Sequence, residues 1–400
     1  MNSALFIAVS PGEIWAALEE DSELAALRLQ RTGAPSRVGE IFLGRVVALR
    51  PELPAALVEI GLDRPGFLDA RDADPRRGLA GLTEGEALIV EVAKEARADK
   101  AVGLRALRAN DSRRTAVEAA ARAAKPPARL DTPQAPIVSV LAAFLAASPD
   151  RIVIDDRNGF AQARSFLQRQ SPDLAGRLVL YTETLPLFEQ AGLLGAIETA
   201  LQPRVDLACG GALHVEATHA ASLIDVDSGQ APALAVNLEA AAAAARQIRL
   251  RNLAGPIVID FVGMKKRADR DKVLAVLGQA LAADPAKPEL LGWTRLGHVE
   301  LTRRRREAPL AEILFERVPG GPLRKTALTV ALEALRAAER EARAQPSRAL
   351  ALAAHPDVVA ALAAGEGLAA RQALEARLAR PLCLAAEPQR PREAFDIRAQ

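Results

Sequence analysis

Three aspartates near the ends of two apolar segments are the residues of this sequence best suited to metal chemistry. Asp225 and Asp227 close the segment SLIDVD, and Asp260 follows PIVI. Successive side chains of a strand point to opposite faces, so Asp225 and Asp227 share one face. If the two segments form neighbouring strands, which lie about 5 Å apart, Asp260 joins them. Crowded carboxylates repel unless a cation neutralises them, and Mg²⁺ or Mn²⁺ accepts such oxygen ligands together with water and phosphate.

The same aspartates have a plainer interpretation, in which each one ends a strand and faces solvent. A helix, NLEAAAAAARQIRLRNLAG, is predicted between the two strands and closes on Gly255. Two strand ends that flank one crossover helix also fit a ligand site, because open α/β sheets bind ligands outside the carboxyl ends of their strands. The pattern alone is compatible with both interpretations.

Positively charged residues lie close to the acidic strands in the sequence. One group directly follows the Asp260 strand, and a second belongs to an Arg-rich segment near residue 300. The candidates for contacts with a phosphate backbone are Lys265, Lys266, Arg295, Arg303 and Arg304. A solvated charged edge is the competing interpretation.

Residues 38–108 contain short strand-like segments with Gly at the bends, which is typical of a small antiparallel barrel. Phe67 follows a Pro-Gly turn and is a candidate for base stacking, whereas Phe42 is a candidate for stacking or for the barrel core. Cations interleave with these aromatic residues, as in barrels that bind single-stranded nucleic acid. They are Arg45, Arg64, Lys94 and Lys100.

The remaining segments indicate how these candidates are positioned. Residues 4–30 predict an opening hairpin. An Ala/Arg-rich helix is predicted to end at Lys125-Pro126-Pro127, and we interpret it as a connector. Strands and helices then alternate as in an α/β layer. From about residue 309 the chain is Ala-rich and is predicted to be helical.

Composition restricts the class of protein. The chain has 400 residues, 50% hydrophobic and 26% charged, so we expect two to four domains with buried cores. The net charge of +2 does not by itself indicate a nucleic-acid partner. Cys209 and Cys383 stand apart without a zinc-binding pattern. No segment resembles a signal peptide or a membrane span, so we expect a cytoplasmic protein without a membrane partner.

The order of these segments resembles the ribonuclease E/G family over most of the chain. The most specific run is NLEAA-x-x-x-A-R-Q-I-R-L-R-N-L-x-G-x-I-V-I-D-F, and RVGEIFLGRV, SLIDVDSG and TRLGHVELTRRR agree with it. The resemblance implies an endoribonuclease that hydrolyses single-stranded RNA and leaves a 5′-phosphate, in ribosomal RNA processing or messenger RNA turnover. It implies Asp225 and Asp260 as ligands of Mg²⁺ (or Mn²⁺), with Asp227 and Lys287 as further catalytic residues.

The family architecture implies a multidomain α/β and β fold. A ribonuclease-H-like domain is interrupted by an OB-fold, S1-type RNA-binding barrel, and a DNase-I-like α/β catalytic domain and a small α-rich domain follow. The expected boundaries are 1–35 and 130–200 for the ribonuclease-H-like domain, 36–108 for the barrel, 109–129 for a helical connector, 201–308 for the catalytic domain and 309–400 for the C-terminal domain.

The sequence also departs from the family pattern. Asp227 stands where the motif usually has Asn, Gly263 replaces a later Asp, and Lys287 stands where familiar members have Arg. The domain that senses a 5′-monophosphate is missing after the barrel, so we expect no strong 5′-end preference. The cysteine pair of the zinc link is missing between residues 307 and 325, so we expect no zinc and no zinc-linked tetramer, and a homodimer through other surfaces stays open.

These departures leave a second hypothesis, a non-catalytic RNA-binding or ribosome-associated factor on the same fold. It predicts salt-sensitive RNA binding without a metal-dependent product.

Overall fold

The structure is a computed structural model in which the chain forms two compact units. It describes residues 3–33, 37–50, 52–96, 101–108, 111, 113–131, 134–218, 220–305, 308–318, 321, 323–346 and 348–399. Unit 1 comprises Met1–Pro35, Ala135–Arg304 and Pro309–Gln400, and unit 2 comprises Ser36–Gln134 and Arg305–Ala308. Within the described ranges, every helix is too short or too polar to cross a membrane.

Unit 2 is a closed five-stranded barrel with one added strand. The strand order β5-β6-β8-β7-β4 closes through pairing of β5 with β4, and β9 pairs with the other end of β4. The barrel elements are β4 (Ile41–Arg50), β5 (Ala55–Glu59), β6 (Gly66–Asp69), η1 (Ala70–Asp72), β7 (Ala87–Lys94), β8 (Gly103–Ala106), α1 (Arg114–Ala123) and β9 (Ala128–Arg129). Small residues allow the tight closure, since a Cβ at Gly44 would lie 2.5 Å from Val58. The predicted barrel is present, and the helix predicted before Lys125 is α1, which belongs to the same compact unit as the barrel.

A five-stranded sheet in unit 1 joins segments from both sides of the barrel. Its order is β11-β10-β1-β2-β3, with β1, β10 and β11 parallel and β1, β2 and β3 antiparallel. The strands are β1 (Ser3–Ser10), β2 (Glu13–Glu20), β3 (Glu23–Arg31), β10 (Arg151–Ile154) and β11 (Leu178–Leu180). Because β1 pairs with β10, the chain leaves this sheet after β3 and returns to it after the barrel.

Helices cover both faces of this sheet, which explains why β2 (EIWAALEE) is buried along most of its length. Side chains alternate along β1: Leu5 and Ile7 pack against α2 and α3, whereas Phe6 and Ala8 pack toward α5 and α6 on the other face. The covering elements are α2 (Pro136–Ala142), η2 (Leu145–Ala147), α3 (Arg157–Gln170), α4 (Pro172–Ala175), α5 (Leu187–Gln190), α6 (Leu193–Leu201) and α9 (Leu310–Leu314).

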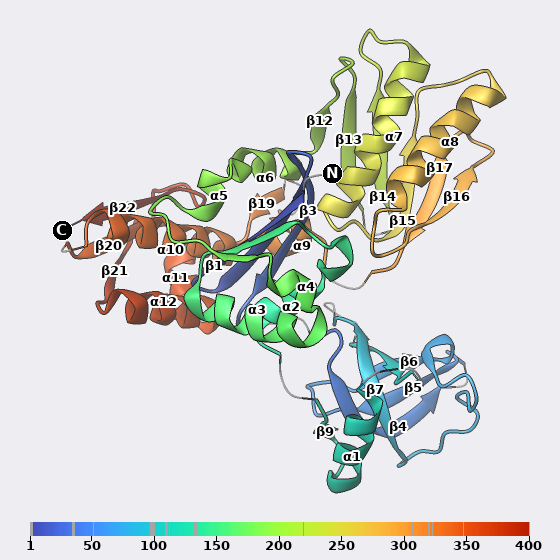
Figure 1. The fold of residues 1–400 in the computed structure, drawn as a ribbon, viewed down its shortest axis with the longest axis horizontal. Helices are drawn as coiled ribbons and strands as arrows, with labels where there is room; N and C mark the ends of the chain where they lie inside the picture. The colour runs from blue at the N-terminus through green and yellow to red at the C-terminus, as the bar shows by residue number, and fades with distance from the viewer. Residues whose placement is uncertain are drawn as a thin grey trace. The chain divides into compact units, whose positions relative to one another are not determined.

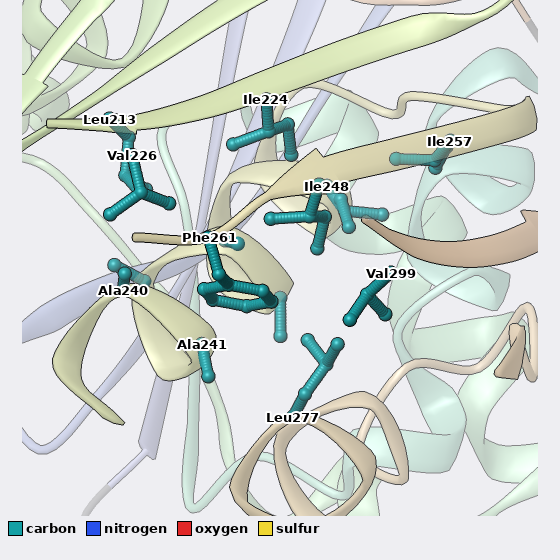
Figure 2. Close-up of a cluster of buried hydrophobic side chains, with 14 of the residues drawn as sticks. Leu213, Ile224, Val226, Ala240, Ala241, Ile248, Ile257, Phe261, Leu277 and Val299 are labelled. Carbon is teal, nitrogen blue, oxygen red and sulfur yellow. The ribbon is translucent and has the colours of Figure 1, made fainter. Parts of the chain in front are cut away.

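A second sheet in unit 1 has six strands in the order β12-β13-β14-β15-β17-β16. They are β12 (Arg204–Asp206), β13 (Ala212–Ala217), β14 (Ser222–Asp227), β15 (Gly255–Asp260), β16 (Glu289–Trp293) and β17 (Val299–Arg303). The helices α7 (Ala233–Leu250) and α8 (Arg267–Leu281) pack together along this sheet (Figure 1). Figure 2 shows the core between this sheet and the two helices, where Ile224 and Val226 of β14 meet Ala240, Ile248 and Leu277 of the helices.

The helix predicted between the aspartate strands is α7, but its ends differ from the prediction. It begins at Ala233, after Pro232, and ends at Leu250. Asn252 follows in the left-handed region, with φ of 53°, and the amide of Leu253 donates to the carbonyl of Ile248. This hydrogen bond and the left-handed Asn252 close the helix as a Schellman motif, so Asn252 and not Gly255 is the terminating residue.

The C-terminal segment of unit 1 contains a sheet that the helical prediction did not include. Strands β20 (Leu350–Ala354), β21 (Leu382–Ala386) and β22 (Phe395–Ala399) pair in the order β21-β20-β22. Helices α10 (Ala327–Ala344), α11 (Pro356–Ala363) and α12 (Gly365–Leu378) pack against them. A short hairpin of β18 (Phe315–Arg317) and β19 (Leu323–Lys325) precedes α10. The segment is still rich in helix, and Ala-rich strands such as LALAA resemble helix by composition.

Candidate active site

Asp225 and Asp260 lie side by side on neighbouring strands. β14 and β15 are parallel, and their register pairs Asp225 directly with Asp260. Neighbouring strands are about 4.8 Å apart, and paired residues project from the same face. The predicted adjacency of these two aspartates is therefore present in the structure, and α7 is the crossover that makes the strands parallel.

Both carboxylates are on the face of the sheet opposite the helix-covered core. Along β14, Ser222, Ile224 and Val226 are buried, and the residues between them are exposed. The Asp260 side chain is 57% exposed. An exposed carboxylate pair leaves room for the water and phosphate ligands that Mg²⁺ retains when only one or two carboxylates hold it.

Asp227 lies on the same face, but a local turn holds its side chain. Its Oδ1 accepts a hydrogen bond from the Gly229 amide at 2.9 Å. The backbone here packs against residues 210 and 211, since a Cβ at Gly211 would lie 2.6 Å from the Asp227 carbonyl oxygen. The third predicted carboxylate is thus near the pair and fixed in a turn.

Two histidines that the sequence interpretation did not select flank the aspartate pair. His214 of β13 is paired in register with Asp225, and His298, which precedes β17, has Nε2 at 3.6 Å from Asp260 Oδ2. No sequence motif marks them, because they come from strands that become neighbours only in the folded sheet. The row His214, Asp225, Asp260 and His298 crosses four adjacent strands or strand ends.

The donor chemistry fits a hard divalent cation held by two carboxylates. Among the described residues, no group of three or more His, Cys, Asp or Glu side chains is arranged to hold a metal ion. A two-carboxylate site is what Mg²⁺ commonly uses with substrate phosphates, and such a site gives it room for several waters.

Some of the predicted cations lie at the same end of the sheet as the aspartate pair. Lys265 and Lys266 are exposed in the loop that directly follows Asp260 and precedes α8. Arg295 is exposed in the turn that joins β16 to β17, next to His298. These three cations are thus exposed at the end of the sheet that carries the aspartate pair.

The other predicted cations of this segment lie at the far end of the sheet. Gly255 pairs with Arg303, and Glu289 pairs with Thr302, which pairs with Pro256. The start of β16 therefore lies about 13 Å along the strands from the level of Asp260, and Lys287 comes two residues before it. The structure does not bring Lys287 to the aspartate pair. Arg304, exposed after β17, is at the same far end.

Arg303 is not available for RNA, contrary to the prediction. It is 7% exposed, with Nε donating to Asp284 Oδ2 at 2.6 Å and Nη1 donating to Asn252 and to the Leu253 carbonyl. Strand alternation turns Arg303 toward the helices, where it closes the core. Because several arginines follow one another in the sequence, their pattern does not show which of them faces the core.

In the barrel of unit 2, the two phenylalanines differ in exposure. Phe42 is 4% exposed and belongs to the barrel core, so its predicted role in RNA stacking is wrong and its alternative as a core residue is correct. Phe67 is half-buried on β6, between buried Gly66 and Leu68. Its side chain therefore faces the outside of the barrel.

Lys94 lies near Phe67 on the outer surface of the barrel. Phe67 pairs with Gly103 of β8, which pairs with Lys94 of β7, and a Cβ at Gly103 would meet the Lys94 side chain at 3.0 Å. Close to them, hydrogen bonds from Arg71 lower the pKa of Asp69 to about 2. This surface combines an aromatic face with cations, as single-strand binding requires.

The remaining barrel candidates are placed as follows. Arg45 is exposed on β4 opposite Glu59 and donates to the Gly85 carbonyl, and Arg64 is exposed in the loop before β6. Lys100 lies outside the described residues.

Comparison with known proteins agrees with this arrangement. The model of the ribonuclease E/G family matches residues 77–306. The chain is 28% identical to ribonuclease G of Escherichia coli strain K12 over 99% of both chains, and 28% identical to ribonuclease G of Haemophilus influenzae over 83% of this chain and 86% of the relative. It is 35% identical to ribonuclease E of a Nostoc species over 72% of this chain and 43% of the relative. The family match covers more than half of the chain, including the barrel strands β7 and β8, both aspartate strands and α7, and on this evidence the chain belongs to the ribonuclease E/G family of endoribonucleases.

Proposed function

We propose that this chain is a metal-dependent endoribonuclease that hydrolyses single-stranded RNA and leaves a 5′-phosphate, in ribosomal RNA processing or messenger RNA turnover. The observation that carries the proposal is the pairing of Asp225 with Asp260 on the open face of the six-stranded sheet. Family membership supplies the reaction class and the RNA substrate.

In this proposal Asp225 and Asp260 hold Mg²⁺ or Mn²⁺. When bound, the ion would polarise the scissile phosphate and lower the pKa of a coordinated water. Lys265, Lys266 and Arg295 bind phosphates beside the cleavage site and offset charge that develops on the phosphoryl oxygens. Asp227, held by Gly229, takes the place of the usual Asn and adds negative charge near the pair.

The outer surface of the barrel supplies the binding platform in this proposal. Phe67 stacks on a base, and Lys94, Arg45 and Arg64 contact the backbone. We further propose that the five-stranded sheet, with parallel β1, β10 and β11, is the ribonuclease-H-like domain, and that the six-stranded sheet with α7 and α8 is the DNase-I-like domain.

A cleavage assay tests the proposal. We expect the purified chain to cut an internally unstructured, 5′-labelled RNA in Mg²⁺ and to leave it intact in EDTA, and the new ends to carry a 5′-phosphate. Asp225→Asn and Asp260→Asn should each lose roughly a thousandfold in rate and retain RNA affinity within about threefold.

Asp206→Asn is a matched control, because Asp206 is exposed on the same sheet face, on β12, and pairs with Arg204. It removes the same charge without touching the aspartate pair. If folded wild-type protein at excess binds the RNA and leaves it uncut in Mg²⁺ and Mn²⁺, the chain is the non-catalytic RNA-binding factor instead. Equal loss of binding in the two aspartate variants would contradict the roles assigned to them.

A further inference from the structure

A cavity of about 630 Å³ in unit 1 lies away from the aspartate pair, at the five-stranded sheet. Val9 and Ser10 at the end of β1 and Asp155 just after β10 line it. These are the carboxyl ends of two adjacent parallel strands, the place where open α/β sheets bind ligands. Its volume lies in the range of small-molecule sites.

The cavity walls are mainly apolar. Leu194 and Ile197 of α6 and Phe188 of α5 line it, and Phe315 and Phe395 line it from the C-terminal part of the chain. Leu194 is 46% exposed, which is unusual for a large apolar side chain that lines a concavity. An apolar ligand body would cover this surface.

The cations that line the cavity are already paired with carboxylates. Lys325 contacts Glu333 at 2.8 Å, and Arg336 pairs with Glu13. On the same helix, α10, Arg340 and Arg343 pair with Glu189 at 3.8 Å and Glu339 at 3.2 Å. An anionic ligand would have to compete with these carboxylates.

Asp155 differs from these paired cations, because among the described residues it has no ion-pair partner. Its Oδ1 accepts a hydrogen bond from the Val9 amide at 2.8 Å, and among the described residues its Oδ2 has no hydrogen-bond partner and no cation at ion-pair distance. Burial raises the pKa of Asp155 to about 6, and this effect outweighs the hydrogen bond from Val9 and the more distant charge of Arg343, which both lower it. A cationic group placed there would supply the missing partner.

We propose that this cavity binds a small organic cation, with an ammonium or amidinium group against Asp155 Oδ2 and an apolar body between α6 and Phe395. A metal ion does not fit the site as well, because among the described residues Asp155 is not part of a group of three or more ligating side chains. The proposal does not depend on RNA cleavage.

Benzamidine and benzamide test this proposal on the full-length chain. They share the aromatic ring and nearly the same shape, and at pH 7.5 only benzamidine is charged. Trp15 lines the cavity and the chain has two tryptophans, so Trp15 fluorescence in a Trp293→Phe background reports binding at this place. We expect saturable quenching by benzamidine and at least tenfold weaker binding of benzamide.

Two variants test whether Asp155 is the residue that binds the charged group of benzamidine. Asp155→Asn keeps an oxygen to accept the Val9 amide and should weaken benzamidine binding at least tenfold, with benzamide unchanged. Asp173→Asn, an exposed change on α4, should bind both probes as the wild type does. Equal affinity of the wild type for the two probes, or full benzamidine affinity in Asp155→Asn, would overturn the proposal. The probe comparison needs only wild-type Asp155, so it decides even if Asp155→Asn does not fold.

Discussion

The two main sheets of unit 1 each place aspartate at the carboxyl end of a parallel strand, with opposite consequences. Helices cover both faces of the five-stranded sheet, and Asp155 is partly buried there with its pKa raised to about 6. Helices cover one face of the six-stranded sheet, and Asp225 and Asp260 stand exposed on the other. In our two proposals, the same residue type binds an organic cation in one sheet and a hydrated metal ion with RNA in the other.

The difference arises from how many faces each sheet buries. A strand that alternates buried and exposed residues, such as SLIDVD, presents its polar side chains to solvent, where a polymer can lie across several strands. A strand buried along most of its length, such as EIWAALEE, leaves only its ends accessible. In both proposals, the exposure of the aspartate, more than its residue type, decides the class of ligand.

The largest effect on stability is expected at Arg303, the charged side chain of the six-stranded sheet that is buried on the helix-covered face. Arg303→Ala should lower the free energy of unfolding by about 3–5 kcal/mol, because Asp284 is left buried without its partner. Arg304→Ala, one residue along and exposed, should change it by less than about 0.5 kcal/mol. Urea unfolding followed by circular dichroism measures both. Equal effects would contradict the two-faced description of this sheet.

Asp155→Asn tests the buried side of the comparison through pH. The pKa of Asp155 is raised from 3.8 to about 6, so the folded state holds its proton more tightly than the unfolded state. The contribution of Asp155 to stability is therefore greatest below pH 4 and decreases as pH rises toward 6.

We expect Asp155→Asn to be more stable than wild type by about 3 kcal/mol at pH 7.5, since one pKa unit corresponds to about 1.4 kcal/mol. The difference should shrink when thermal unfolding is repeated at pH 4.5. Asp173→Asn serves as the exposed control. A stability difference that does not depend on pH would show that Asp155 is not desolvated.

The barrel of unit 2 sharpens the same contrast between inner and outer faces. Phe67→Ala, on the outside, should weaken binding of single-stranded RNA by about 1–2 kcal/mol because a stacking face is lost. Leu53→Ala is the control, since Leu53 is 60% exposed and apolar but not aromatic. Filter binding at fixed salt measures both, and equal losses would place RNA on another surface of the barrel.

The smallest effect concerns the 5′ end of the RNA. The described chain passes from α1 through β9 to α2 without a further domain. Cleavage rates of RNAs with a 5′-phosphate and a 5′-hydroxyl should therefore agree within about twofold. A tenfold preference for the phosphate would show that another surface binds it.

Much of this arrangement was predictable where a local pattern determines it. The alternation in SLIDVD and PIVID predicted that Asp225 and Asp260 lie together if the two strands are neighbours, and the short strands with Gly at the bends predicted the barrel. Residues whose role depends on non-local pairing were not found this way. The burial of Arg303, the far position of Lys287 and the C-terminal sheet follow from strand register, and Asp155 is distinguished only by the helices that bury it.

The central claim is that Asp225 and Asp260 act together on one metal ion, and the most direct test is the single-turnover cleavage rate of Asp225→Asn, Asp260→Asn and the double variant in Mg²⁺. Residues that act as a unit are not additive, so we expect the double variant to be no slower than either single variant, within about threefold. If the two losses multiply in the double variant, or if either single variant keeps more than about a tenth of the wild-type rate, the shared metal site is contradicted.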